Sequence, residues 1–221
     1  MSSRAGVAFL FDVDNTLLDN DRVKADMAAG IRAAVGPVLA DRFWELYEEV
    51  RAEKDVVDLP VTLERFEDAY HDEPGVLTVI GLVMGYPFET ALYPGALAAL
   101  AHVQEIGPAG IVTDGDPGYQ PVKIARAGLT AAVNGRVYIS VHKEERLAEV
   151  QRAMPADRYV LVDDKLAVLN RVEMRHAAVM TVHVRQGHYA SMTDGYRPAD
   201  RTLEHIGDLA ELDLETFLKP S

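Results

Sequence analysis

The chain has 221 residues, of which 48% are apolar and 26% charged, as is usual for a packed globular protein rather than a disordered or fibrous one. Its 35 acidic and 22 basic residues give a formal net charge of −13, which disfavours binding to nucleic acid or to an anionic membrane surface. It contains no cysteine, which excludes disulfides, thiolate zinc sites and cysteine nucleophiles.

The N-terminal residues 1–6 lead directly into a short apolar run at 7–11, which ends at Asp12. A secretory signal needs a longer apolar segment and a cleavage site, and a membrane span needs about 20 apolar residues, so we expect a cytoplasmic protein. The length and aromatic content of the run 7–11 predict a strand that is buried on both faces.

Residues 20–92 show apolar residues at spacings of three and four, and proline and glycine interrupt this pattern at 36–37, 59–60 and 73–75. The spacing predicts three or four short helices that form a bundle of their own. We expect aromatic residues of this segment to form the core of that bundle, namely Phe43, Trp44 and Tyr47.

Beyond residue 93, short apolar runs at 109–112, 137–140, 159–162 and 178–182 alternate with helix-like segments at 96–105, 120–127, 144–154 and 166–176. This alternation predicts a Rossmann-like three-layer α/β core with a mostly parallel sheet. A last helix is expected at 206–218, packed on the edge. The predicted domains are therefore a core formed by 1–19 and 93–221 and a helical domain formed by 20–92.

Polar residues follow the predicted strands, and ligands of open parallel sheets bind at the carboxyl ends of the strands. Asp12 and Asp14 follow the first strand, and two carboxylates at this spacing suit a hard cation such as Mg²⁺. The same residues could instead cap a helix. Thr113, followed by Gly115, could bind an anion or form an ordinary turn.

The ends of the third and fourth predicted strands are followed by a lysine and by a pair of adjacent aspartates, respectively. Lys143 opens a predicted helix, where most lysines are solvated, although so acidic a protein needs a cation to bind an anion. Asp163 and Asp164 repel each other, and a bound cation would relieve the repulsion. A doubled helix cap is the alternative for this pair.

Together these residues resemble the motifs of the haloacid dehalogenase (HAD) superfamily, whose members are mostly Mg²⁺-dependent phosphohydrolases. The superfamily's motif order is Asp-x-Asp-x-Thr after the first strand, then Ser or Thr, then Lys or Arg, then an acidic pair. The residues that match are Asp12, Asp14, Thr16, Thr113, Lys143, Asp163 and Asp164. The predicted helical domain falls where that superfamily carries its type C1 cap. Asp114 departs from the pattern, because asparagine is commoner there.

The resemblance implies a role for each residue. Asp12 would be the nucleophile that forms an aspartyl-phosphate, and Asp14 the general acid and then the general base. Mg²⁺ would be held by Asp12, the backbone carbonyl of Asp14, and Asp163 and Asp164. The transferring phosphate would contact Thr113, Asp114 and Lys143.

The leading hypothesis is a Mg²⁺-dependent phosphohydrolase for a small organic phosphate, acting as a monomer or homodimer. Alternatives are a phosphotransferase or phosphomutase of the same superfamily and a non-catalytic binding or regulatory module. A haloacid dehalogenase is less favoured, because displacing halide needs neither a metal nor a carboxylate at Asp14. His142 is the only histidine expected near the site, and residues 185–189 are expected to form an ordinary loop, with a place at the rim of the site as the alternative.

Overall fold

The structure is a computed structural model that describes residues 5–175 and 179–217. Within these residues, six strands form one sheet in the order β3-β2-β1-β4-β5-β6, and every neighbouring pair is parallel. The strands are β1 (Ala5–Phe11), β2 (Ala109–Asp114), β3 (Val137–Ser140), β4 (Ala156–Asp163), β5 (Val179–Val184) and β6 (Arg201–Leu203). The predicted parallel α/β fold is confirmed. The three residues of β6 are too few to leave an apolar pattern in the sequence, and this strand was not predicted.

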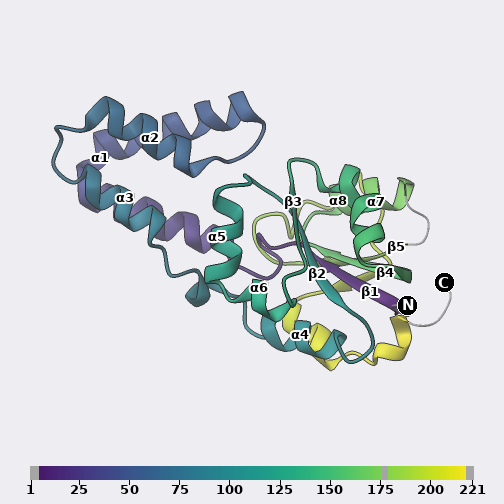
Figure 1. Cartoon of the computed structure of the whole chain (residues 1–221). Helices are drawn as coiled ribbons and strands as arrows, with labels where there is room; N and C mark the ends of the chain where they lie inside the picture. Colours follow the sequence, from purple (N-terminus) through teal and green to yellow (C-terminus); the bar gives the residue numbers. More distant parts are fainter. Residues whose placement is uncertain (1–4, 176–178, 218–221) are drawn as a thin grey trace.

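Helices cover both faces of the sheet, which gives the predicted three layers (Figure 1). Alternate residues of β1 are buried against opposite layers, because successive side chains of a strand point to opposite faces. Ala8 and Leu10 pack with α7 (Lys143–Ala153) and α8 (Leu166–Arg175). Phe9 and Phe11 belong to the core on the other face, which is covered by α4 (Ala96–Val103), α5 (Tyr119–Arg126) and α6 (Leu129–Ala132). Apart from α6, which was not predicted, these helices begin and end within two residues of the predicted bounds.

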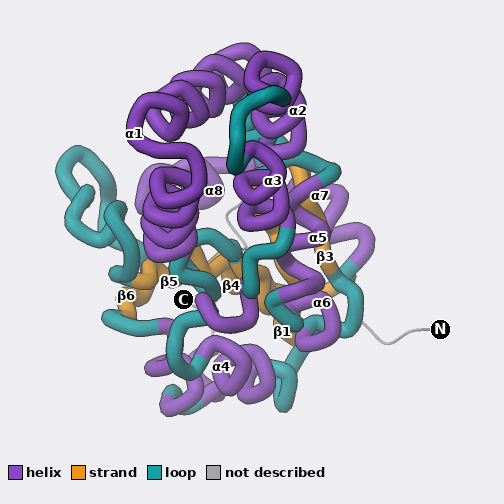
Figure 2. The backbone as a smooth tube through the Cα atoms, turned by 90° about the vertical axis from the view of Figure 1, so that its left-hand side faces the viewer, coloured by secondary structure: helices purple, strands orange, loops and turns teal. Residues whose placement is uncertain are grey.

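A lobe of helices stands beyond the carboxyl ends of the strands (Figures 1 and 2). It contains α1 (Asn20–Lys54), α2 (Leu59–Tyr70), α3 (Val76–Met84) and the short 3₁₀ helix η1 (Phe88–Ala91). The long helix α1 is broken at Gly36, whose φ of 76° is not helical, and Pro37 follows at the start of the second half. The second half folds back along the first, since the Lys24 Nζ atom lies 5.5 Å from the centre of the Tyr47 ring.

The lobe leaves and re-enters the core at adjacent points just after β1. Leu18 and Leu92 form an antiparallel bridge, and the backbone N–H of Tyr93 donates to the carbonyl of Leu17 at 3.0 Å. The N–H of Asp19 donates to the carbonyl of Ala91 at 2.8 Å. This pairing agrees with joints near residues 19 and 93, and the division into a core domain and a helical domain stays a prediction.

The C-terminal segment departs from the prediction. In place of one helix over 206–218, the structure has two 3₁₀ helices, η2 (Ile206–Glu211) and η3 (Leu214–Phe217), separated by two residues, of which Leu212 is extended. Buried apolar side chains of the segment, including Ile206 and Leu209, produced the helical spacing without requiring a continuous helix. The ends of three predicted elements, at His176, Ala178 and Leu218, lie outside the described residues. No helix in the described ranges is long and apolar enough to cross a membrane.

Candidate active site

Two of the aspartates that follow predicted strands, Asp12 and Asp163, lie beside one buried lysine, Lys143. The Lys143 Nζ atom lies 2.6 Å from Asp12 Oδ1 and 2.5 Å from Asp163 Oδ2, and all three side chains are at most 4% exposed. Lys143 is the first residue of α7, and its backbone N–H donates to Asp114 Oδ1 at 2.6 Å. Burial disfavours the charge of Lys143, but the nearby carboxylates outweigh it and raise the pKa of this lysine, which therefore remains a cation.

Three buried carboxylates surround this lysine, those of Asp12, Asp163 and Asp164, with one oxygen of each within 4.8 Å of the others. Burial opposes ionisation of Asp12, but the charges of Lys143 and Lys165 hold its pKa below the ordinary value. The pKa of Asp163 is raised by burial and by the charge of Asp12, against the effect of Lys143. Burial and the two neighbouring carboxylates raise the pKa of Asp164 to about 9.

Asp164 supplies the test of whether a divalent cation fits this cluster. Its side chain is fully buried, and neither of its carboxylate oxygens has a hydrogen-bond partner among the described residues. A buried carboxylate without a partner is costly, and a cation bound beside it would remove that cost. Oxygen ligands on adjacent strand ends are also the donor set that Mg²⁺ prefers. The residues present therefore fit a Mg²⁺ ion held by Asp12, Asp163 and Asp164.

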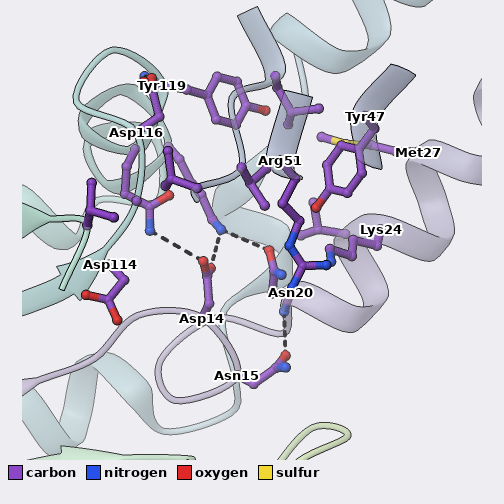
Figure 3. Close-up of a pocket in the computed structure, with 18 of the residues that line it drawn as sticks. Asp14, Asn15, Asn20, Lys24, Met27, Tyr47, Arg51, Asp114, Asp116 and Tyr119 are labelled. Atoms are coloured by element: carbon purple, nitrogen blue, oxygen red, sulfur yellow. Dashed lines mark hydrogen bonds and ion pairs between the residues drawn. The ribbon is translucent and has the colours of Figure 1, made fainter. Parts of the chain in front are cut away.

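The Asp14 carboxylate contacts two side chains of α5, which the dashed lines in Figure 3 mark. It forms an ion pair with Lys123 and accepts a hydrogen bond from Gln120 Nε2 at 3.4 Å. The same Lys123 ammonium group donates to Asn20 Oδ1 at 2.9 Å, so it joins Asp14 to the first residue of α1. The side chain of Asp14 is thus not placed as a metal ligand, and a contribution from its backbone carbonyl stays a prediction.

Lys123 was not singled out from the sequence, because a lysine on a helix is usually solvated. Here its side chain is 5% exposed. The sequence holds a weak signal, since Lys123 lies three residues after Gln120 and therefore on the same face of α5. Gln120 also contacts Thr113, with 3.4 Å between Nε2 and Oγ1. That face of α5 thus contacts two of the predicted site residues, Asp14 and Thr113.

Thr113 and Asp114 end β2 beside the lysine, as predicted. Thr113 is buried, and its side chain helps to lower the pKa of Asp12 through a hydrogen bond. Asp114 accepts the N–H of Lys143 and so fixes the start of α7. Direct contact of either residue with a phosphate stays a prediction.

The loop after β5 approaches the turn after Asp14. Asn15 has a φ of 60°, and its Oδ1 atom accepts the N–H groups of Asn20 and Asp21 at the start of α1. The N–H of His188 donates to Asp21 Oδ2 at 2.8 Å. Residues 185–189 thus form a loop, as predicted, and His188 and Tyr189 of this loop line the pocket, which is the alternative place at the rim.

Gly187 allows this approach, and replacing it tests how tightly the loop is packed. Its φ is 64°, and a Cβ atom there would lie 2.5 Å from Asn15 Cγ. We expect Gly187→Ala to lower the free energy of unfolding by at least about 2 kcal/mol, through backbone strain and this clash. Gly195→Ala is the matched control, because Gly195 has a φ of 83° with no atom near the added Cβ. Equal losses from the two variants in urea denaturation would show that the close approach is unimportant.

A pocket of about 450 Å³ opens above these residues, between the sheet and the helical lobe (Figure 3). Its lining includes Asp14, Lys123 and Lys165 from the core, and Trp44 and Tyr47 from α1. These two aromatic side chains therefore line the pocket and also pack in the core of the lobe. Phe43 is fully buried, as expected. His142 lines the pocket, but so does His188, so the expectation of a single histidine near the site was wrong.

No protein-family model and no curated protein sequence matches the chain, but solved structures do. A haloacid dehalogenase-like hydrolase from Burkholderia xenovorans LB400 shares 43% identity, with 97% of this chain and 100% of that one covered and a TM-score of 0.87. A HAD-hydrolase from Bacillus subtilis bound to magnesium shares 16% identity, with 94% and 98% covered and a TM-score of 0.62. The L-2-haloacid dehalogenase from Xanthobacter autotrophicus, with chloropropionic acid covalently bound, shares 20% identity, with 93% and 97% covered and a TM-score of 0.59. The last two show similarity of fold alone.

Proposed function

The chain belongs to the haloacid dehalogenase-like hydrolases, and on this basis we propose that it hydrolyses small organic phosphates with the help of Mg²⁺. The observation that carries the proposal is the cluster of Asp12, Asp163 and Asp164, in which Asp164 has no hydrogen-bond partner among the described residues. A nucleophile that attacks a phosphate must overcome repulsion between two anions, and a cation in this cluster would screen it. A halide-displacing enzyme has no need for such a cluster.

Asp12 is the proposed nucleophile. Lys143 keeps it ionised, since the two groups are 2.6 Å apart and the pKa of Asp12 is lowered. Its free oxygen attacks phosphorus, the bond to the leaving oxygen breaks, and an aspartyl-phosphate forms. Lys143 and Thr113, which lie beside Asp12, would bind the oxygens of the transferring phosphoryl group.

Asp14 is the proposed proton donor and acceptor. Its side chain is partly exposed and lines the pocket, where a leaving group would lie. It would give a proton to the leaving alcohol and then take one from the water that cleaves the aspartyl-phosphate. Its ion pair with Lys123 and its contact with Gln120 hold the carboxylate in one orientation for both steps.

The test is turnover of para-nitrophenyl phosphate with and without metal. We expect removal of divalent cations with EDTA to reduce turnover by more than about 100-fold, and added Mg²⁺ to restore it. Chloropropionic acid, assayed for chloride release, is the comparison substrate because a related fold binds it. Chloride release that exceeds phosphate release, or full phosphate release in EDTA, would contradict the proposal. Transfer of the phosphoryl group to an added alcohol in place of water would favour the phosphotransferase alternative.

The buried lysine on α5 gives a second prediction. We expect Lys123→Met to lower kcat by roughly 10- to 100-fold, because Asp14 then loses the charge that orients it. Lys123→Arg keeps the charge and should recover much of the rate. A loss of kcat that is as large in Lys123→Arg as in Lys123→Met would show that the positive charge does not orient Asp14 and would indicate a purely structural role for Lys123.

A further inference from the structure

The pocket has a second polar wall, which the proposed phosphoryl transfer does not use. Lys24, Tyr47 and Arg51 all line it, and all three lie on α1. They are far apart in the sequence, but the break at Gly36 folds the two halves of α1 together and brings them to one side of the pocket (Figure 3). The same pocket is lined by Asp14, which follows β1, and by Lys123 of α5.

The hydroxyl group of Tyr47 is the first sign that this wall binds a ligand. Tyr47 is 4% exposed, and its hydroxyl oxygen has no hydrogen-bond partner within the described part of the chain. Burial raises the pKa of Tyr47 to about 12, so the group is a protonated donor at neutral pH. A buried donor without an acceptor is costly, and a ligand oxygen in the pocket would supply that acceptor.

Lys24 and Arg51 line the pocket together with Tyr47 and add positive charge, which would attract a negatively charged ligand oxygen. Lys24 forms no ion pair with any described residue and lies against the Tyr47 ring. Arg51 contacts Glu48, with 3.3 Å between Nη1 and Oε2, but both side chains are more than half exposed. Such a solvated pair is weak and can be exchanged for a ligand.

Among the described residues, none of the carboxylates that line the pocket forms an ion pair with Lys24 or Arg51. Asp14 pairs with Lys123, and Asp55 lies 3.4 Å from His142. The other two accept backbone N–H groups, Asp114 from Lys143 at 2.6 Å and Asp116 from Gly118 and Tyr119 at 2.8 Å each. The wall formed by α1 therefore presents positive charge and hydrogen-bond donors to the pocket.

We infer that the substrate is a phosphate ester with a second anionic group, a carboxylate or another phosphate, that binds to Lys24, Tyr47 and Arg51. The inference rests on the proposed function, because it places the reacting phosphate at Asp12. The pocket volume of about 450 Å³ exceeds what a lone phosphate needs and lies in the range of pockets for whole small molecules. The helical lobe would then select substrates by their distal charge, while the strand ends perform the reaction.

The test compares aryl phosphates that differ only in the para substituent: carboxyl, methyl, aminomethyl and a second phosphate. We expect kcat/KM for para-carboxyphenyl phosphate or for the bisphosphate to exceed that for the methyl compound by at least about tenfold. Whichever of the two anionic compounds is preferred identifies the second anion. No preference for either over the methyl compound would overturn the inference and leave phosphohydrolase activity intact.

The compounds also differ in their intrinsic reactivity. This difference cancels when the ratio of kcat/KM for an anionic compound to kcat/KM for the methyl compound is compared between the wild type and a variant. Lys24→Met and Arg51→Met should each lower the anionic-to-methyl ratio several-fold with little change for the methyl compound. Lys24→Glu should shift the preference toward the aminomethyl compound, and Tyr47→Phe should lower the ratio without altering charge. Arg32→Met is the matched control, since Arg32 is an exposed cation of α1 outside the pocket lining. An unchanged ratio in Lys24→Met would overturn the inference.

Failure of the proposed function would be recognised separately. If none of these compounds is hydrolysed, calorimetric binding of the carboxyl and methyl compounds to Asp12→Asn tests the second wall without catalysis. Tighter binding of the carboxyl compound that is lost in Asp12→Asn/Lys24→Met would support the inference, and equal binding of both compounds would overturn it.

Discussion

Replacement of Asp12 by asparagine is expected to reduce turnover of para-nitrophenyl phosphate by at least roughly 10⁴-fold, because an amide is neither a competent nucleophile nor a good ligand for a cation. The fold should survive. The substitution keeps the volume of the buried side chain, and Lys143 retains Asp163 as an ion partner at 2.5 Å. The change also removes one of the three clustered carboxyl groups. Steady-state kinetics and thermal unfolding of the same preparation measure the two expectations.

Asp41→Asn is the control for this experiment, because Asp41 is exposed on α1 and remote from the pocket lining. It should be purified in the same way and should show wild-type activity, which would exclude loss during preparation. Turnover by Asp12→Asn within tenfold of the wild type, in a preparation free of contaminating phosphatase, would remove Asp12 from the role of nucleophile. A large fall in thermal stability would instead show that Asp12 is needed for folding.

Replacement of Asp14 by asparagine should separate the two halves of the reaction. Nitrophenolate leaves without help from an acid, so the aspartyl-phosphate should still form at Asp12. Its hydrolysis needs a base, and we expect steady-state turnover to fall by roughly 10²- to 10⁴-fold. The result should be a rapid burst of about one nitrophenolate per protein molecule, followed by slow release. Mass spectrometry of the quenched protein should then detect the added phosphoryl group.

The double variant Asp12→Asn/Asp14→Asn is the control for this trapping experiment, because it lacks the residue that carries the phosphoryl group. It should give neither the burst nor the added mass. If Asp14→Asn alone turns over at the wild-type rate and accumulates no phosphorylated protein, Asp14 is not the proton carrier. If the added mass persists in the double variant, the phosphoryl group is attached elsewhere and the assignment of Asp12 is wrong.

The sequence by itself was sufficient for the parallel sheet apart from its short edge strand β6, and for the polar residues at the carboxyl ends of β1 to β4. In a parallel sheet all strands end at the same edge, so polar residues that follow successive apolar runs must converge there. This rule requires only local patterns, and it brought together Asp12, Lys143 and Asp163 although more than a hundred residues separate the first two. The presence of a lobe of helices was also readable from the period of its apolar residues.

Other contacts could be seen only in the tertiary structure, because the residues that form them show no distinctive pattern in the sequence. Lys123 resembles any solvated helical lysine until α5 packs beside Asp14. Gly187 resembles an ordinary loop glycine until its backbone meets Asn15. Lys24 and Tyr47 face one pocket only because the break at Gly36 folds α1 back on itself. The period of the apolar residues predicts which side chains share one face of a helix. The direction in which the second half of α1 runs depends instead on the backbone conformation of Gly36 and on the packing around it.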